Sequence, residues 1–191
     1  IRDAIVGRKN AFVEDLYQSL QKDLAPETKA DNIFATFANN ADELKKAESA
    51  AYTRIFDQSA GQTFKEIDDA VLFLANSSRN SRNLINKKLD ENGLKPIFKM
   101  VGKGDKAKLE LTRSLNLEEG EIVKRAFMDA KNTAQRAGSS DKANTMKGYE
   151  TTIKNILDKI SPDLQATRKN WAMIEDSVKQ FEAGQKIFST K

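Results

Sequence analysis

The sequence predicts a mainly α-helical protein, an elongated antiparallel helical bundle with one small β-hairpin inserted in the middle. Apolar residues recur every three or four positions along most of the 191-residue chain, which is the spacing of a single helix face. A period of two, typical of a strand, appears instead at 107–112. We therefore expect one continuous domain with an N-terminal helical part (1–93), a hairpin (94–117) and a C-terminal part of three antiparallel helices (118–191).

The N-terminal part begins with two amphipathic stretches. An apolar stripe along 3–24 predicts a helix that ends at Ala25-Pro26, because proline disfavours the helical conformation in the residue before it. The next stretch continues to Gly61, and Asn39-Asn40 is a candidate break that would divide it into two helices.

Two shorter helices complete this part. Thr63 and Glu66 have the spacing of a capping box, which predicts the start of a short helix through Ala75. After the polar run 76–78, another helix ends at Gly93, where a left-handed glycine cap is expected. The apolar face of this second helix is thin, so its stability depends on neighbouring elements.

The hairpin is predicted from two short runs around a glycine-containing turn. Residues 96–101 and 107–112 flank Gly102-Lys-Gly-Asp-Lys106. The turn has some likeness to a phosphate-binding loop, but it lacks the Lys-Ser/Thr ending and the strand-to-helix context of such loops. A lone hairpin is marginally stable in water, so we expect it to pack on the helices or on another chain.

The last third carries three apolar helix faces. The first helix is predicted to start near Glu118 and to stop at Gly138, and the second to end at Ile160. Ser161-Pro162 then supplies an N-cap and a proline suited to the first position of the final helix. Short connections between three such helices indicate an antiparallel bundle.

The final helix presents the candidate protein-contact residues. Its apolar stripe, which is close to heptad spacing, consists of Trp171, Ile174, Val178 and Phe181. Trp171 is the single tryptophan of the chain, and on this stripe it is expected to be a core or interface anchor rather than a ligand platform. Any part of the stripe that stays exposed is the surface we expect to bind a protein.

Composition argues against most enzyme chemistry. The chain contains no cysteine and no histidine, which excludes a disulfide framework, a thiolate nucleophile and a zinc finger, and removes the commonest general base. Carboxylate-based hydrolysis remains an alternative that requires a cleft with two facing carboxylates. We expect a protein that is not an enzyme, with no catalytic residue, cofactor, metal or small-molecule substrate.

Charged residues form two local clusters. Glu118, Glu119 and Glu121 could bind a hard cation, but at a helix start they are better explained by the helix dipole. The hairpin region has a basic excess, and its possible phosphate contacts are Lys99, Lys103, Lys106 and Lys108. Because Phe98 alone could stack on bases there, we favour lysines that protect an exposed hairpin edge, with nucleic-acid contact as the alternative.

Short motifs at helix ends and turns are distributed over 43–188. The C-terminal third contains Lys124-Arg-Ala126, Arg136-Ala-Gly138, Ser161-Pro162, Ala166-Thr-Arg168, Trp171-Ala172 and the glycine-containing segment 181–188. Upstream lie 47–52, 89–93 and the Gly-Lys-Gly-Asp turn. In this combination the chain resembles a helical module of bacteriophage and prophage proteins. It departs from their pattern at Leu164, where an aromatic residue is usual, and at Ala50, where proline is common.

The resemblance implies a role rather than a chemistry. It implies part of a larger phage-encoded polypeptide, virion-associated or active in assembly or genome delivery, which binds a protein partner or itself. No catalytic residue is associated with the module. No apolar run approaches the roughly 20 residues of a membrane span, no secretion signal opens the chain, and the chain begins at Ile1 rather than Met. The expected location is the bacterial cytoplasm, the phage particle or both.

Overall fold

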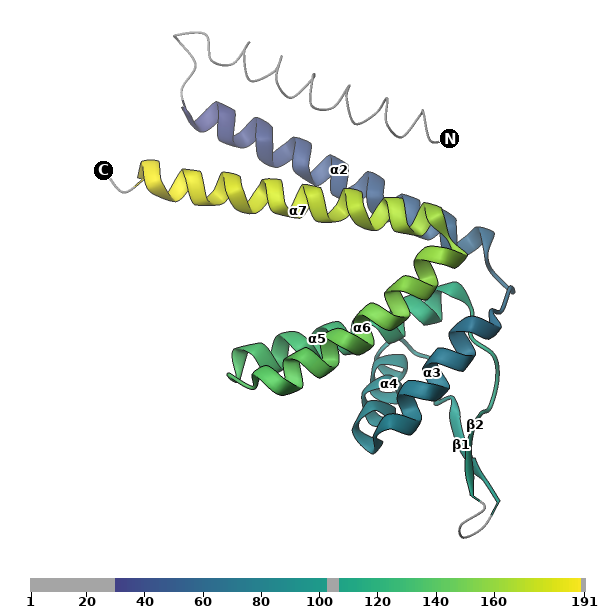
Figure 1. Cartoon of the computed structure of the whole chain (residues 1–191). Helices are drawn as coiled ribbons and strands as arrows, with labels where there is room; N and C mark the ends of the chain where they lie inside the picture. Colours follow the sequence, from purple (N-terminus) through teal and green to yellow (C-terminus); the bar gives the residue numbers. More distant parts are fainter. Residues whose placement is uncertain (1–29, 103–106, 190–191) are drawn as a thin grey trace. The chain divides into compact units, whose positions relative to one another are not determined.

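The described part of the chain is mainly helical with one small antiparallel hairpin, as the sequence predicts (Figure 1). The computed structural model describes residues 30–102 and 107–189. Its elements are α2 (Ala30–Gln58), α3 (Lys65–Ser77), α4 (Arg79–Glu91), β1 (Phe98–Val101), β2 (Lys108–Leu111), α5 (Leu117–Arg136), α6 (Ser140–Ile160) and α7 (Pro162–Ser189). The predicted helix 3–24 and the turn residues Lys103 and Lys106 lie outside the described residues.

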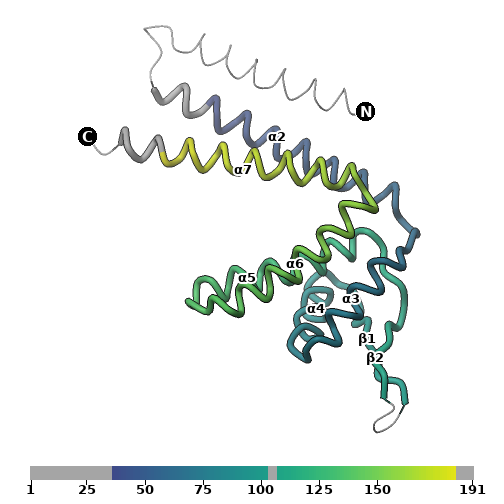
Figure 2. The backbone as a smooth tube through the Cα atoms, in the orientation of Figure 1, coloured from purple at the N-terminus to yellow at the C-terminus, as the bar shows by residue number. Residues whose placement is uncertain are grey.

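The chain divides into two compact units. Unit 1 consists of Ile1–Ser49 and Asn170–Lys191, and unit 2 of Ala50–Lys169. The helices α2 and α7, which can be followed along the tube in Figure 2, each contribute residues to both units. Within the described ranges, no helix has the length and apolar character needed to span a membrane.

Several predicted helix ends are confirmed. Gly93 and Gly138 have φ values of 74° and 71°, the left-handed conformation that closes α4 and α5. The Ser161 hydroxyl accepts a hydrogen bond from the Leu164 backbone N–H at 3.2 Å and caps α7. At the start of α5, Asn116 and Glu119 form a reciprocal capping box.

Two local predictions are wrong. Asn39-Asn40 does not break the chain, because α2 runs through it without interruption. Thr63 does not cap α3, which begins at Lys65 with Phe64 as an N-cap residue that has no side-chain cap hydrogen bond. A long-range contact tethers this end of α3 instead, since the Phe64 N–H donates to the carbonyl oxygen of Leu115 at 3.1 Å and the Asp68 carboxylate accepts from the Leu115 N–H at 2.8 Å.

The core of unit 2 joins α3, α4, α5, α6 and the start of α7. Its fully buried residues include Ile67, Leu74, Ile85, Leu89, Ile97, Leu115, Leu117, Phe127, Ile153, Leu157 and Leu164. The hairpin pairs Phe98 with Leu111 and Met100 with Leu109 across its strands. Leu109 is buried in this same core, so the hairpin packs on the helices of its own chain.

Gly120 marks the tightest approach of α5 to its neighbours. A Cβ atom there would lie 2.8 Å from Leu157 Cδ2 and 3.1 Å from Ile67 Cδ1, and both of these side chains are fully buried. Gly148 lies within α6, and a Cβ atom there would meet nothing within 4 Å. Close packing therefore requires glycine at position 120, whereas position 148 has space for a Cβ atom.

Alanine substitutions at these two glycines are expected to have opposite signs. Alanine in place of glycine favours a helix by about 1 kcal/mol, whereas overpacking a filled core costs about 1–3 kcal/mol. Gly120→Ala should therefore lower the free energy of unfolding by about 1 kcal/mol, and Gly148→Ala should raise it by a similar amount. Urea denaturation followed by circular dichroism measures both. A Gly120→Ala variant as stable as Gly148→Ala would contradict the close packing of α5.

Candidate functional site

The apolar stripe of the final helix lies in unit 1, where α7 pairs with α2. The rings of Phe37 and Phe181 stack with centroids 3.8 Å apart and planes inclined by 15°. Lys45 and Glu175 form an ion pair at 3.2 Å, and the Asn170 amide donates to Glu48 at 3.1 Å. Because the partners on α7 fall in number as those on α2 rise, the two helices are antiparallel along this stretch.

The pair leaves its apolar stripe only half covered. Trp171, Ile174, Val178 and Phe181 are each half-buried, and Ala41 is the one buried residue among the side chains described in unit 1. Two helices can cover one side of such a stripe, whereas the stripe of a helix in a bundle meets two or more neighbours. The four candidate protein-contact residues thus lie together and remain accessible in part.

Polar groups flank the stripe where α2 and α7 meet, and they fix the pairing of these two helices. Burial raises the pKa of Glu48 above its ordinary value, and the hydrogen bond from Asn170 offsets part of that effect. Glu48 and Asn170 both lie at the end of the pairing nearest unit 2 in sequence. A carboxylate and an amide at one defined position specify register better than apolar contacts alone, because they lose their bond if the helices slide.

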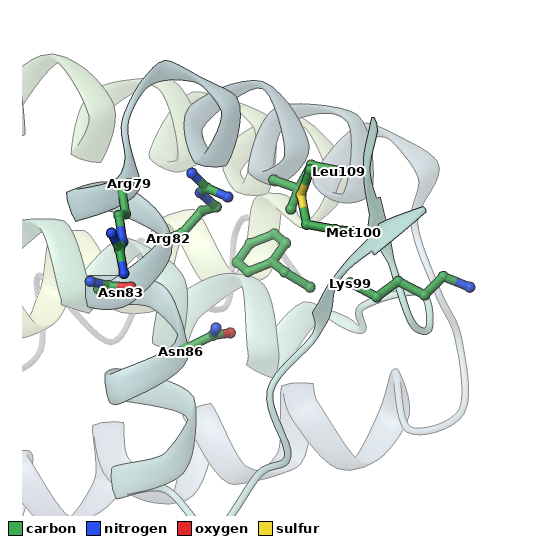
Figure 3. A pocket seen from close by; sticks show the side chains of 8 residues that line it. Arg79, Arg82, Asn83, Asn86, Lys99, Met100 and Leu109 are labelled. Carbon is green, nitrogen blue, oxygen red and sulfur yellow. The ribbon is translucent and has the colours of Figure 1, made fainter. Parts of the chain in front are cut away.

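A second feature is a groove in unit 2 between α4 and the hairpin. It has a volume of about 190 Å³ and adjoins a second hollow of about 380 Å³, with which it shares Arg82, Met100 and Leu109. Figure 3 shows Arg79, Arg82, Asn83 and Asn86 on the α4 side and Met100 and Leu109 on the hairpin side. We call this the α4–hairpin groove. Neither hollow is lined by a carboxylate, so neither provides the facing carboxylates of a hydrolase.

Two of the lysines predicted to contact phosphates border these hollows: Lys99 lines the α4–hairpin groove and Lys108 lines the adjoining hollow. Lys99 pairs across the strands with Glu110, at an ammonium-to-carboxylate distance of 3.8 Å, and Figure 3 shows its side chain directed away from α4. Lys108 is exposed and borders the second hollow. Lys103 and Lys106 are outside the described residues. The structure therefore does not gather the four lysines into one site among the residues it describes.

Two further cations of the groove come from α4, where sequence reasoning found only a weak helix face. Arg79 and Arg82 lie in its first turns, and the first turn contains no acidic residue. Positive charge at a helix N-terminus opposes the helix dipole, so this arrangement gives the helix no stability. Four donor-bearing side chains at spacings of three and four, namely Arg79, Arg82, Asn83 and Asn86, were a signal present in the sequence.

A third feature is a buried ion network around Glu121. The Glu121 carboxylate, 2% exposed, accepts from Lys124 Nζ at 2.6 Å and from Arg168 Nη1 at 3.3 Å. Arg125 approaches the same carboxylate at 3.4 Å, and Arg168 also pairs with Asp158. Burial lowers the pKa of Lys124, and the nearby negative charge of Glu121 offsets that effect in part. This network connects α5, α6 and α7 by charge.

The three acidic residues predicted to cluster at the start of α5 do not bind one common partner. Glu119 forms a two-pronged ion pair with Arg113 and also accepts from the Asn116 N–H at 3.1 Å. Glu121 belongs to the buried network, and Glu118 is exposed. Among the described residues, no group of three or more acidic side chains is arranged to hold a metal ion. Two of the three carboxylates therefore bind cations of the protein itself.

Comparison of the chain with protein-family models, with curated proteins and with solved structures finds no match. The interpretation of this protein therefore depends on its own residues.

Proposed function

We propose that the chain is a non-enzymatic interaction module, part of a larger phage- or prophage-encoded polypeptide, that acts through protein–protein contacts in virion assembly or genome delivery. The observation that carries the proposal is the half-covered stripe Trp171, Ile174, Val178 and Phe181 on α7. A stripe with an anchoring aromatic residue and two branched aliphatic residues is typical of surfaces that bind other helices.

The phage assignment rests on the sequence motifs alone, and several of their residues can be located in the fold. Lys124 and Arg125 belong to one motif and Arg168 to another, and all three side chains meet at Glu121. Gly93 and Gly138, which end two other motifs, both adopt the left-handed conformation of a helix stop. Several of the resembling residues therefore have structural roles in unit 2.

The proposal commits to self-association through the stripe. Its test is the solution mass of the chain by light scattering during size exclusion, at low and at high salt. A contact made by apolar helix faces is insensitive to salt, whereas a contact between exposed charges weakens as salt screens them. The expected result is an oligomer of the same mass under both conditions.

Substitution within the stripe is expected to abolish this oligomer. Ile174→Asp with Val178→Asp places two carboxylates in the apolar contact, where an unpaired charge is costly to bury. The matched control, Ser177→Asp with Gln180→Asp, adds the same charges at exposed positions of the same helix. We expect the first variant to elute as a monomer and the control to elute as the wild type. A wild-type chain that is monomeric at both salt concentrations would contradict the proposal. It would mean that residues of the same chain cover the stripe.

A further inference from the structure

The two walls of the α4–hairpin groove differ in chemistry. The α4 wall carries the guanidinium groups of Arg79 and Arg82 and the side-chain amides of Asn83 and Asn86. The hairpin wall is mostly apolar and is formed by Phe98, Met100 and Leu109, of which Met100 is 56% exposed, with Lys99 as its one charged residue. A ligand that fits both walls must combine negative charge with a flat or flexible apolar part.

One hydrogen-bonding group of the α4 wall is buried and has no partner within the described residues. Arg82 Nε is shielded from solvent and has no hydrogen-bond partner there. Asn86 accepts a hydrogen bond from the Ile97 N–H at 3.4 Å through its side-chain oxygen, which positions the side chain against the start of β1. A buried donor without an acceptor costs free energy. The Arg82 side chain lines the groove, where a phosphate oxygen would be a strong acceptor for its guanidinium group.

We propose that the α4–hairpin groove binds single-stranded nucleic acid, with backbone phosphates on Arg79 and Arg82 and an unpaired base against Phe98 and Met100. The planar guanidinium fork matches phosphate oxygens, and asparagine amides also donate to phosphate and sugar oxygens. The four donor side chains extend over about 10 Å of helix, so the wall spans more than one phosphate. A nucleic-acid strand has one negative charge per nucleotide, so it can supply acceptors to these donors wherever it starts along the groove. An acidic peptide must instead place its carboxylates at matching positions.

An apolar wall next to the cations favours single strands over duplex. In a duplex the base faces are stacked on one another, whereas a single strand can place a base on an aromatic or apolar side chain. This site is distinct from the stripe on α7, because it lies wholly within unit 2 and shares no residue with the stripe.

The test is fluorescence anisotropy of a labelled oligodeoxythymidylate titrated with the chain over a range of salt concentrations. Arg79→Ala with Arg82→Ala should weaken binding about tenfold or more and reduce the slope of log affinity against log salt by about two. Met100→Ala should weaken binding without changing that slope, because it removes a base contact and no charge. Arg79→Ala alone, at an exposed position, should reduce the slope by about one.

A matched control separates the groove from general electrostatics. Lys142→Ala with Lys147→Ala removes the same charge from exposed positions of α6 and should leave the affinity near that of the wild type. Equal losses in the control and in the arginine pair would overturn the proposal, as would an oligonucleotide duplex that binds as tightly as the single strand. Displacement of the oligonucleotide by an equal charge concentration of polyglutamate would identify the groove as a site for acidic peptides. Circular dichroism melting verifies that all variants fold.

Discussion

Replacing Glu121 with alanine is expected to lower the free energy of unfolding by about 3–5 kcal/mol, because the change leaves the buried Lys124 without its counter-ion and removes one of the two carboxylates that pair with Arg168. Lys124 and Arg168 each have a side chain only 10% exposed, and both depend on the Glu121 carboxylate. Domains of this size are stable by about 5–15 kcal/mol, so the loss is a large part of the total. Urea denaturation of the purified chain measures it.

The neighbouring Glu118 provides the control for this prediction. It lies in the first turn of α5, three positions before Glu121, and is exposed, so Glu118→Ala removes only a favourable interaction with the helix dipole, worth about 0.3–1 kcal/mol. In addition, Glu121→Ala combined with Arg168→Ala should cost less than the sum of the two single changes, because each single change already removes the ion pair between these two side chains. Additive costs would show that the two groups do not interact.

Replacing Phe127 with alanine is expected to cost a similar amount, about 3–5 kcal/mol, because it opens a cavity in the core of unit 2. The Phe127 side chain is fully buried and meets Tyr149 edge to face, with ring centroids 5.3 Å apart and planes inclined by 75°. Aromatic pairs in this geometry contribute beyond the area that they bury. The same denaturation experiment applies.

The control for Phe127 is a second phenylalanine in the same unit. Phe73 lies on α3 and is 67% exposed, so Phe73→Ala should change the free energy of unfolding by no more than about 0.5 kcal/mol. Equal effects of the two substitutions would contradict the burial that the structure assigns to α5.

The helical fold could be predicted because its signals are local. Gly93 and Gly138 close helices through their own backbone conformation, and Ser161 caps α7 through a bond to a residue three positions away. The wrong predictions involved contacts with distant residues. Thr63 has the spacing of a cap, but the start of α3 is tethered to Leu115, and the continuity of α2 at Asn39-Asn40 accompanies its pairing with α7.

The candidate sites were harder to predict than the helices, because they depend on contacts between residues far apart in the sequence. Glu121 and Arg168 are 47 positions apart, and no local pattern connects them. One signal was available, because Arg168 lies on the stripe between Leu164 and Trp171, where an apolar residue is expected. The α4–hairpin groove could not be anticipated, since Arg79 and Arg82 meet the hairpin only through the packing of α4 on the core.

The location of the single tryptophan has a spectroscopic consequence. Trp171 belongs to unit 1, whereas most of the buried core, including Phe127, belongs to unit 2. Intrinsic tryptophan fluorescence therefore reports on the α2–α7 pair. The far-ultraviolet ellipticity, by contrast, sums the signal of all the helices in both units. If the two units unfold separately, the fluorescence and ellipticity transitions will have different midpoints in denaturant, and coincident transitions will mean that they unfold as one cooperative system. The native chain thus carries its own reporter for one unit without any added label.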